Sequence, residues 1–319
     1  APRVMAYHSR QALVLRSEQE KHLDHVLKRK EKLGEQAAAF SDEVIRQHLD
    51  VTDYDNVIFI LVATPVEEVG RDHDFDWAIV EPSSYRSIIQ LSGRVLRHRK
   101  LEQDIQKPNI ALMQYNLKGL RKAKVAFEKP GFEINNDKFK LQNKNLNELL
   151  DISGTEFSIN AIPRIKANQP LQAIKKLADL EHAVMADALT SYNKVGAKPL
   201  NSWLTQKWFL TALPQQFNPF RQSSPNIQLF ALWRNHKLTF CEKNDFGEYI
   251  DRSGFYNIQP VQLNELEQQR LWLNRNYYDI LRRLAVDKLQ ENEDIEEEVE
   301  KLSKRYGEIM LPEYDENKK

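Results

Sequence analysis

The sequence predicts an α/β fold for its first 120 residues, and two observations support that class. Apolar runs of strand length alternate with patterns of helical period, the order that builds a parallel sheet flanked by helices. The run at 57–62 is continuously apolar, as a strand buried on both faces should be. A mixed α+β, helix-rich region is predicted to follow, and 41% hydrophobic residues over 319 positions suffice for two ordinary domains.

Strands and helices are expected to alternate along this first part. The first helix has a capping box made by Ser17 and Glu20 and a terminating glycine at Gly34. A second, shorter helix is expected from Ser41, and a third from Ser84 to about residue 98. The strand candidates are residues 4–7, 57–62, 77–80 and 110–115.

The composition divides the rest of the chain. Residues 118–144 carry eight Lys or Arg against three Asp or Glu, so we expect a surface connection there. An amphipathic helix at 171–189 is expected to bridge to a separate unit at 200–319. That unit should contain a hairpin of 229–233 and 237–241, a long helix at 263–289 and an acidic, solvated end. The predicted domains are residues 1–125, 126–199 and 200–319.

The bulk properties exclude several classes of protein. Lys plus Arg and Asp plus Glu both total 46, so the net charge gives no evidence for a polyanion or a membrane surface as a partner. The single cysteine, Cys241, excludes a disulfide framework and fits a cytoplasmic location. No apolar stretch reaches the roughly 18 residues of a membrane-spanning helix, so no membrane partner is expected. Because the sequence enters an apolar run almost at once, we expect a fragment of a longer protein.

An acidic loop follows the strand predicted at 57–62. It lies where the carboxyl end of a parallel strand meets solvent, and α/β sheets bind ligands at such edges. Thr64 offers a hydroxyl group, and the loop offers backbone N–H groups, to a nucleic-acid phosphate. Gly70 allows a close approach of the backbone. The loop is therefore a candidate nucleic-acid contact.

A pair of arginines forms the second candidate site. Arg94 and Arg97 are three residues apart on the third predicted helix, so we expect both guanidinium groups on one face and directed at one anion. An arginine supplied across a cleft stabilises the negative charge that develops on a γ-phosphoryl group during transfer. A solvated helix face is the ordinary explanation for an arbitrary arginine pair. The loop upstream, with Gln90 and Gly93 in register, favours the catalytic interpretation.

These two segments resemble conserved helicase motifs. Residues 64–76 resemble motif V, and Gln90-x-x-Gly93-Arg94-x-x-Arg97 resembles motif VI, of superfamily 2 helicases. The chain also resembles the CRISPR-associated helicase-nuclease of type I systems, subtype I-F (YPEST). The resemblance lies in the stretch Tyr7-His-Ser-Arg10 with Arg16 and in the sequences of 67–77 and 91–98. The resemblance implies part of the second RecA-like helicase lobe, a bridging helix and an accessory C-terminal domain.

The resemblance also implies roles for individual residues. It makes Arg97 the arginine finger, Arg94 its companion at the γ-phosphate, and Gln90 a polar contact to the nucleotide. Where superfamily 2 helicases usually have an aliphatic residue, this sequence has Arg71, which either contacts a phosphate or pairs with Asp74. The implied cofactor-binding residues are Gln90, Gly93 and Asp72, and the implied nucleic-acid residues are Thr64, Glu68, Gly70 and Arg71.

The implied activity is that of an ATP-dependent DNA helicase-nuclease that unwinds and degrades target DNA in CRISPR interference. Its cofactors would be ATP and Mg²⁺, held mainly by a first lobe outside this sequence, and a divalent transition metal in a nuclease domain that is also outside it. Its partners would be single-stranded DNA, the CRISPR surveillance complex, the adaptation integrase, phage anti-CRISPR proteins and the rest of its own chain.

The sequence has no Gly-x-x-x-x-Gly-Lys-Ser/Thr loop, so we expect the isolated chain to be inactive. Two alternatives stay open. One is another superfamily 2 motor, such as an RNA helicase or a restriction translocase. The other is a non-catalytic docking or regulatory module.

Other patterns have plainer explanations. His22 and His25 have the spacing of helical metal ligands but no third ligand, so an exposed helix face is expected. Within motif V, His73 and Asp74 lack the further histidines of a metal site. Asp42 and its neighbour Glu43 are expected as first-turn acids of a helix. We expect the aromatic residues between 203 and 233 to form a core, although they could stack on bases, and residues 118–144 either form a solvated linker or line a strand's path.

Overall fold

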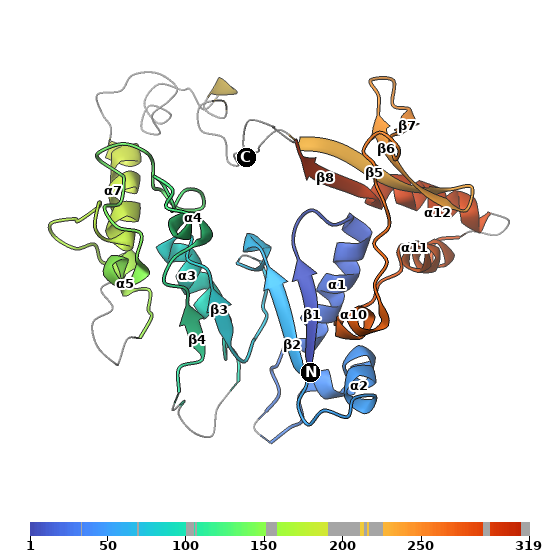
Figure 1. Ribbon diagram of the computed structural model, residues 1–319, viewed down its shortest axis with the longest axis horizontal. Coiled ribbons are helices and arrows are strands. Elements are labelled where there is room, and N and C mark those ends of the chain that lie inside the picture. Colours follow the sequence, from blue (N-terminus) through green and yellow to red (C-terminus); the bar gives the residue numbers. More distant parts are fainter. Residues whose placement is uncertain are drawn as a thin grey trace. The chain divides into compact units, whose positions relative to one another are not determined.

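The computed structural model describes residues 1–32, 34–68, 70–99, 105, 107–150, 158–190, 211–213, 216, 226–289 and 294–313. They belong to two compact units, one made of Ala1–His73 with Ser223–Lys319 and the other of Asp74–Gln222. Each unit contains one pair of parallel strands with helices beside it, as the predicted α/β class requires (Figure 1). A helix long and apolar enough to cross a membrane does not occur among the described residues.

The parallel pair of the first unit is formed by β1 (Pro2–Tyr7) and β2 (Ile58–Ala63). They run in register from Pro2 opposite Ile58 to Tyr7 opposite Ala63. Side chains of β1 alternate between exposed and buried, so one face of this strand lies in the core. The expectation that β2 is buried on both faces is wrong, because Ile58 and Val62 are 46% and 59% exposed.

Two helices follow β1, and the first differs from its prediction. Helix α1 (Leu13–Val26) begins after Ala12, so the capping box predicted for Ser17 is wrong. The extra turn forms because Val14 packs among buried side chains of the C-terminal helices. A 3₁₀ turn, η1 (Ala38–Ser41), precedes α2 (Glu43–Asp50). The Asp42 carboxylate accepts the Ile45 N–H at 3.1 Å, which confirms Asp42 at a helix start.

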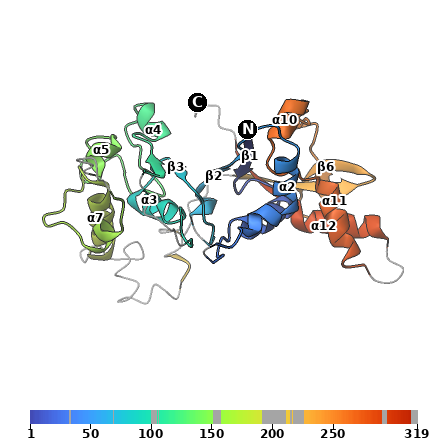
Figure 2. The same ribbon diagram turned by 90° about the horizontal axis from the view of Figure 1, so that it is seen from below.

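A four-stranded antiparallel sheet makes up much of the C-terminal half of the first unit. Its order is β7 (Tyr249–Asp251), β6 (Lys237–Lys243), β5 (Asn226–Arg234) and β8 (Glu308–Pro312). The predicted hairpin is confirmed as β5 and β6. Helix α12 (Ile295–Tyr306) packs on β5 and lies beside α11 (Tyr277–Val286) in both ribbon views (Figures 1 and 2). The acidic segment thus contributes buried Val299 and Leu302 to a core.

The long helix predicted at 263–289 is interrupted. It is divided into α10 (Glu265–Arg270) and α11, and the residues between them run beside β1. The Trp272 N–H donates to the Val4 carbonyl at 3.0 Å, and Leu271 forms a parallel bridge with Val4. This pairing takes the backbone out of a helical conformation. Because the partner strand is distant in sequence, the helical periodicity of 263–289 could not predict it.

The same segment attaches the C-terminal residues to α1. Arg275 Nη1 donates to the Leu15 carbonyl at 2.8 Å and to Gln19 Oε1 at 2.9 Å. Trp272 Nε1 donates to His22 Nε2 at 3.0 Å. His22 is therefore not on an exposed face, and its burial lowers the pKa of its imidazole. Residues 226–289 and 294–313 fall in one compact unit with the N-terminal residues. The domain limits at 125 and 199 stay predictions.

The second unit has its own parallel pair and core. Strands β3 (Ala78–Val80) and β4 (Ile110–Leu112) pair with each other, and α3 (Tyr85–Ser92) lies against β3. The later helices are α4 (Leu117–Leu120), α5 (Leu146–Leu149), α6 (Ile162–Ile165) and α7 (Leu177–Thr190). Helix α7 covers most of the amphipathic helix predicted at 171–189 and contributes Leu177 and Leu180 to the core.

Residues 118–144 are not a solvated connection. They contribute Phe127, Phe139 and Leu141 to the same core as α7. The buried Glu133 carboxylate accepts backbone N–H groups from Phe127 at 2.9 Å and Leu141 at 3.1 Å. A carboxylate bonded in this way compensates the cost of its own burial and holds the chain that surrounds it. Of the aromatic cluster predicted at 203–233, only Phe230 and Trp233 fall within the described residues, and both pack against buried side chains.

Candidate functional site

The motif V loop, residues 64–73, leaves the carboxyl end of β2 as the sequence predicts. The Thr64 N–H donates to the Tyr7 carbonyl at 3.0 Å, which adds a last hydrogen bond to the parallel ladder and leaves the Thr64 side chain exposed. A short 3₁₀ turn, η2 (Pro65–Glu67), follows. Glu68, predicted to contact nucleic acid, is 6% exposed, so its carboxylate faces protein more than solvent.

Helix α1 anchors the motif V loop through acidic side chains. Arg71 pairs with Glu20, and its guanidinium lies 3.9 Å from Asp24 and over the Tyr7 ring. Within the first unit, then, the acidic partners of Arg71 come from α1. Burial and the hydrogen bond to Glu20 raise the pKa of Tyr7 to about 12, so its hydroxyl stays a donor at neutral pH.

A buried histidine completes this attachment. His73 Nδ1 lies 2.8 Å from Glu67 Oε1, and His73 Nε2 lies 2.9 Å from Asp24 Oδ1. The His73 ring therefore lies between a carboxylate of η2 and a carboxylate of α1. Asp72, predicted to bind the cofactor, forms an ion pair with Lys30 at 2.6 Å. No group of three or more His, Cys, Asp or Glu in the described ranges could hold a metal ion.

Gly70 is required by its backbone conformation. Its φ is +77°, and a Cβ built on it has no heavy atom within 4 Å. The close approach of a nucleic-acid phosphate at Gly70, which the sequence suggests, stays a prediction. The left-handed conformation is the physical reason for glycine here.

Replacing Gly70 with alanine is expected to destabilise the motif V loop by about 1–2 kcal/mol, because an L-residue carries that cost in the left-handed region. The measurement is hydrogen–deuterium exchange of peptides from the loop in the full-length protein. Gly254→Ala is the matched control, since a Cβ there also has open space while φ lies outside that region. Equal protection of the loop in both variants would contradict the prediction.

The segment that resembles motif VI is shorter as a helix than predicted. Helix α3 ends at Ser92, and Gly93 is its C-cap with φ −68°. Beyond it, Val95 forms a parallel bridge with Phe75: the Phe75 N–H donates to the Arg94 carbonyl at 2.8 Å, and the Leu96 N–H donates to the Phe75 carbonyl at 2.9 Å. These bonds replace the helical ones, so the prediction of a helix to residue 98 is wrong.

The two candidate arginines do not share an exposed helix face. Both follow the end of α3, and Arg94 is 4% exposed whereas Arg97 is exposed. Leu96, between them, has φ +51°, so the chain turns sharply just before Arg97. The spacing argument therefore fails for this pair, although the roles assigned to Arg94 and Arg97 stay predictions.

Asp74 fixes the backbone on the C-terminal side of the exposed arginine. Its fully buried carboxylate accepts the His98 N–H at 3.0 Å and Arg99 Nη2 at 2.8 Å. Arg99 also pairs with Asp76 and donates to the Phe75 carbonyl at 2.7 Å. Burial alone would lower the pKa of Arg99, but its hydrogen bonds to Asp74 and Asp76 raise it.

The predicted site residues thus form two local groups. Thr64, Glu68, Gly70, Arg71 and Asp72 lie in one loop of the first unit, and Gln90, Gly93, Arg94 and Arg97 lie in one segment of the second. Sequence reasoning missed the supporting residues Glu20, Asp24, Lys30 and Arg99. Each is a charged residue distant in sequence from its partner, and charge alone does not identify such pairs.

Comparison with known proteins assigns the chain to a family. Residues 1–100 match a family model described as the C-terminal part of the CRISPR-associated nuclease/helicase Cas3. The chain is 39% identical over 235 residues to a CRISPR-associated nuclease/helicase Cas3 of subtype I-F/YPEST from Pectobacterium atrosepticum, a match that covers 71% of this chain and 20% of the relative. It is 35% identical over 317 residues to a protein of the same description from Pseudomonas aeruginosa, covering 96% of this chain and 27% of that relative.

These matches confirm the family resemblance that the motif sequences indicate. The chain belongs to the family of CRISPR-associated nuclease/helicases and corresponds to a C-terminal part of the subtype I-F form. It spans about a quarter or less of the curated relatives it matches.

Proposed function

We propose that this chain is part of an ATP-dependent superfamily 2 DNA helicase-nuclease that unwinds and degrades target DNA in CRISPR interference. The observation that carries the proposal is the position of Arg97, exposed on a segment fixed by Asp74 and Phe75. The family relationship supports the same activity, because the relatives are described as nuclease/helicases.

Arg97 acts in this proposal as the arginine finger. A finger stabilises the charge that develops on the transferred phosphoryl group, and its effect depends on being held in place before the reaction. The Leu96 and His98 N–H groups are both hydrogen-bonded, so the backbone that presents Arg97 is ordered. Arg94, being buried, would act near the γ-phosphate only through a rearrangement, and packing is the role its burial favours.

Nucleotide contact by this chain would be limited to the motif VI segment. Gln90 Oε1 is buried and has no hydrogen-bond partner among the described residues, so it could accept a hydrogen bond from a nucleotide group. ATP and Mg²⁺ need a phosphate-binding loop, which the sequence lacks, so the chain would complete a nucleotide site that another part of the protein forms. The completed site would catalyse transfer of the γ-phosphoryl group of ATP to water.

The motif V loop would contact single-stranded DNA. Exposed Thr64 and the loop backbone lie at the carboxyl end of β2, and contacts of this kind bind phosphates without reading sequence. Arg71, held by Glu20, would position the loop more than it contacts a phosphate. The further partners we propose are the CRISPR surveillance complex, the adaptation integrase and phage anti-CRISPR proteins.

ATP hydrolysis by the full-length protein is expected to be stimulated by single-stranded DNA more than by RNA of the same length. The 319-residue chain alone should give no turnover, since it has no phosphate-binding loop. Steady-state phosphate release with each nucleic acid measures both. Stimulation by RNA alone would favour an RNA helicase, and turnover by the isolated chain would overturn the assignment of its role.

A further inference from the structure

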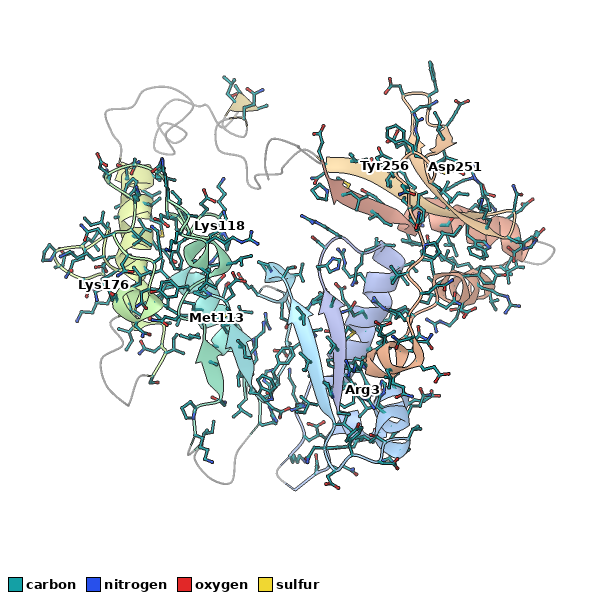
Figure 3. All side chains as sticks on the ribbon, in the orientation of Figure 1. Arg3, Met113, Lys118, Lys176, Asp251 and Tyr256 are labelled. Carbon is teal, nitrogen blue, oxygen red and sulfur yellow. The ribbon has the colours of Figure 1, made fainter. Side chains whose placement is uncertain are left out.

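The loop that follows β4 carries a local excess of positive charge. Residues 118–129, called the basic loop below, contain five basic residues and one acidic residue, in a chain whose charges balance overall. The acidic residue, Glu128, pairs with Lys118 on α4, labelled in Figure 3. The other four basic residues are exposed, and no salt bridge to them occurs within the described ranges: Arg121, Lys122, Lys124 and Lys129.

Asn116 holds the two ends of the basic loop together. Its buried side chain accepts the Gly119 N–H at 2.8 Å and donates to the Ala126 carbonyl at 2.9 Å. It also donates to the Pro82 carbonyl at 3.1 Å, which attaches the loop to the segment after β3. One buried amide therefore uses both its donors and its acceptor to close the loop.

The interior and the far end of the basic loop are also bonded. The Lys122 N–H donates to the Gly119 carbonyl and the Ala123 N–H to the Lys118 carbonyl, both at 3.0 Å. Glu133 accepts the Ala126 N–H at 2.8 Å, just before the buried Phe127. Because the backbone is already ordered, a ligand that binds here does not have to order it, and that lowers the entropic cost of binding.

We propose that the basic loop binds the phosphate backbone of single-stranded nucleic acid. The choice of ligand rests on the proposed function. A polynucleotide carries a phosphate at every residue, so several cations on one ordered loop can each meet a phosphate and release the counterions bound there. Lys122 has φ +57°, a conformation uncommon outside glycine, and it places this side chain at the sharp turn of the loop.

The test is the salt dependence of DNA binding by the full-length protein. The variant combines Arg121→Gln, Lys122→Gln and Lys124→Gln, and the probe is fluorescein-labelled oligothymidylate followed by fluorescence anisotropy. Three lost phosphate contacts should reduce the slope of log K against log salt by about 2, and weaken binding by roughly tenfold or more at low salt. At saturating DNA, the kcat of ATP hydrolysis should be unchanged, since the loop holds none of the candidate catalytic residues.

A second triple variant provides the control. Lys175→Gln, Lys237→Gln and Arg282→Gln remove the same number and kinds of charge from exposed positions outside the loop, and the slope should stay that of the wild type. An unchanged slope in the basic-loop variant would overturn the inference. So would a loss of binding to the surveillance complex with DNA binding intact, which would indicate a protein partner. Wild-type protein that binds no single-stranded DNA would instead overturn the proposed function.

Discussion

Replacing Arg97 with alanine in the full-length protein is expected to abolish ATP hydrolysis stimulated by single-stranded DNA. An arginine finger contributes about 10³–10⁵ in kcat, so the loss should reach at least about 10³-fold. Nucleotide binding should change little, because a finger acts mainly on the charge of the transition state. Phosphate release at saturating DNA and titration with a fluorescent nucleotide measure the two quantities separately.

Two further variants make the Arg97 result specific. Arg97→Lys keeps the positive charge but loses the planar fork, so most of the loss should persist. Arg282→Ala removes an exposed arginine from α11 and should leave kcat at the wild-type value. If Arg97→Ala hydrolyses ATP at the wild-type rate, Arg97 is not the finger, and the proposed role of the motif VI segment is wrong.

The sequence located strands better than it located helix ends. Each of the four strand candidates of the first part overlaps a strand, because short apolar runs carry that information locally. The errors lie where distant segments pair. Helix α3 stops early because Phe75 bonds to Arg94 and Leu96, and the predicted helix at 263–289 is divided because Trp272 bonds to Val4. Neither pairing can be predicted from the local periodicity of the sequence.

The basic segment 118–144 shows a second limit of predicting structure from composition. Its surface charge conceals the buried side chains Asn116 and Glu133, whose hydrogen bonds organise the segment. An acidic residue amid lysines suggests an ion pair with solvent around it, and Glu133 does pair with Lys144. Its three backbone partners, however, are set by the tertiary fold. Composition therefore indicated the charge of this segment but not the side chains that it contributes to a core.

In the candidate site, the sequence identified the residues within the motifs but not the residues that hold the motifs in place. The sequences of the two motifs identified Arg97 and Gly70, and the structure adds a physical reason for the position of each. The acids that hold the motif V loop, Glu20 and Asp24, lie on α1, where Glu20 was assigned to a helix cap instead. Helix α1 is in turn held by Arg275 from the C-terminal half of the unit. Residues that support a motif thus come from distant parts of the chain.

Asp74→Asn is expected to release the backbone that carries Arg97. Breaking a buried ion pair costs about 3–5 kcal/mol, and because the Arg99 side chain is 24% exposed we expect about 2–4 kcal/mol of local destabilisation. The His98 amide should lose its protection from hydrogen–deuterium exchange by on the order of 30-fold or more. A displaced finger should also lower kcat by about 10- to 100-fold.

Asp76→Asn separates the contribution of burial from the loss of a charge. Asp76 binds the same Arg99 guanidinium, but its side chain is 59% exposed, so this variant should cost no more than about 1 kcal/mol. Exchange at His98 and DNA-stimulated turnover should then stay near wild type, while both change in Asp74→Asn. If the two variants behave alike, the buried carboxylate does not hold the segment. Loss of protection without loss of turnover would mean that Arg97 needs no fixed backbone, and the argument from its position would fail.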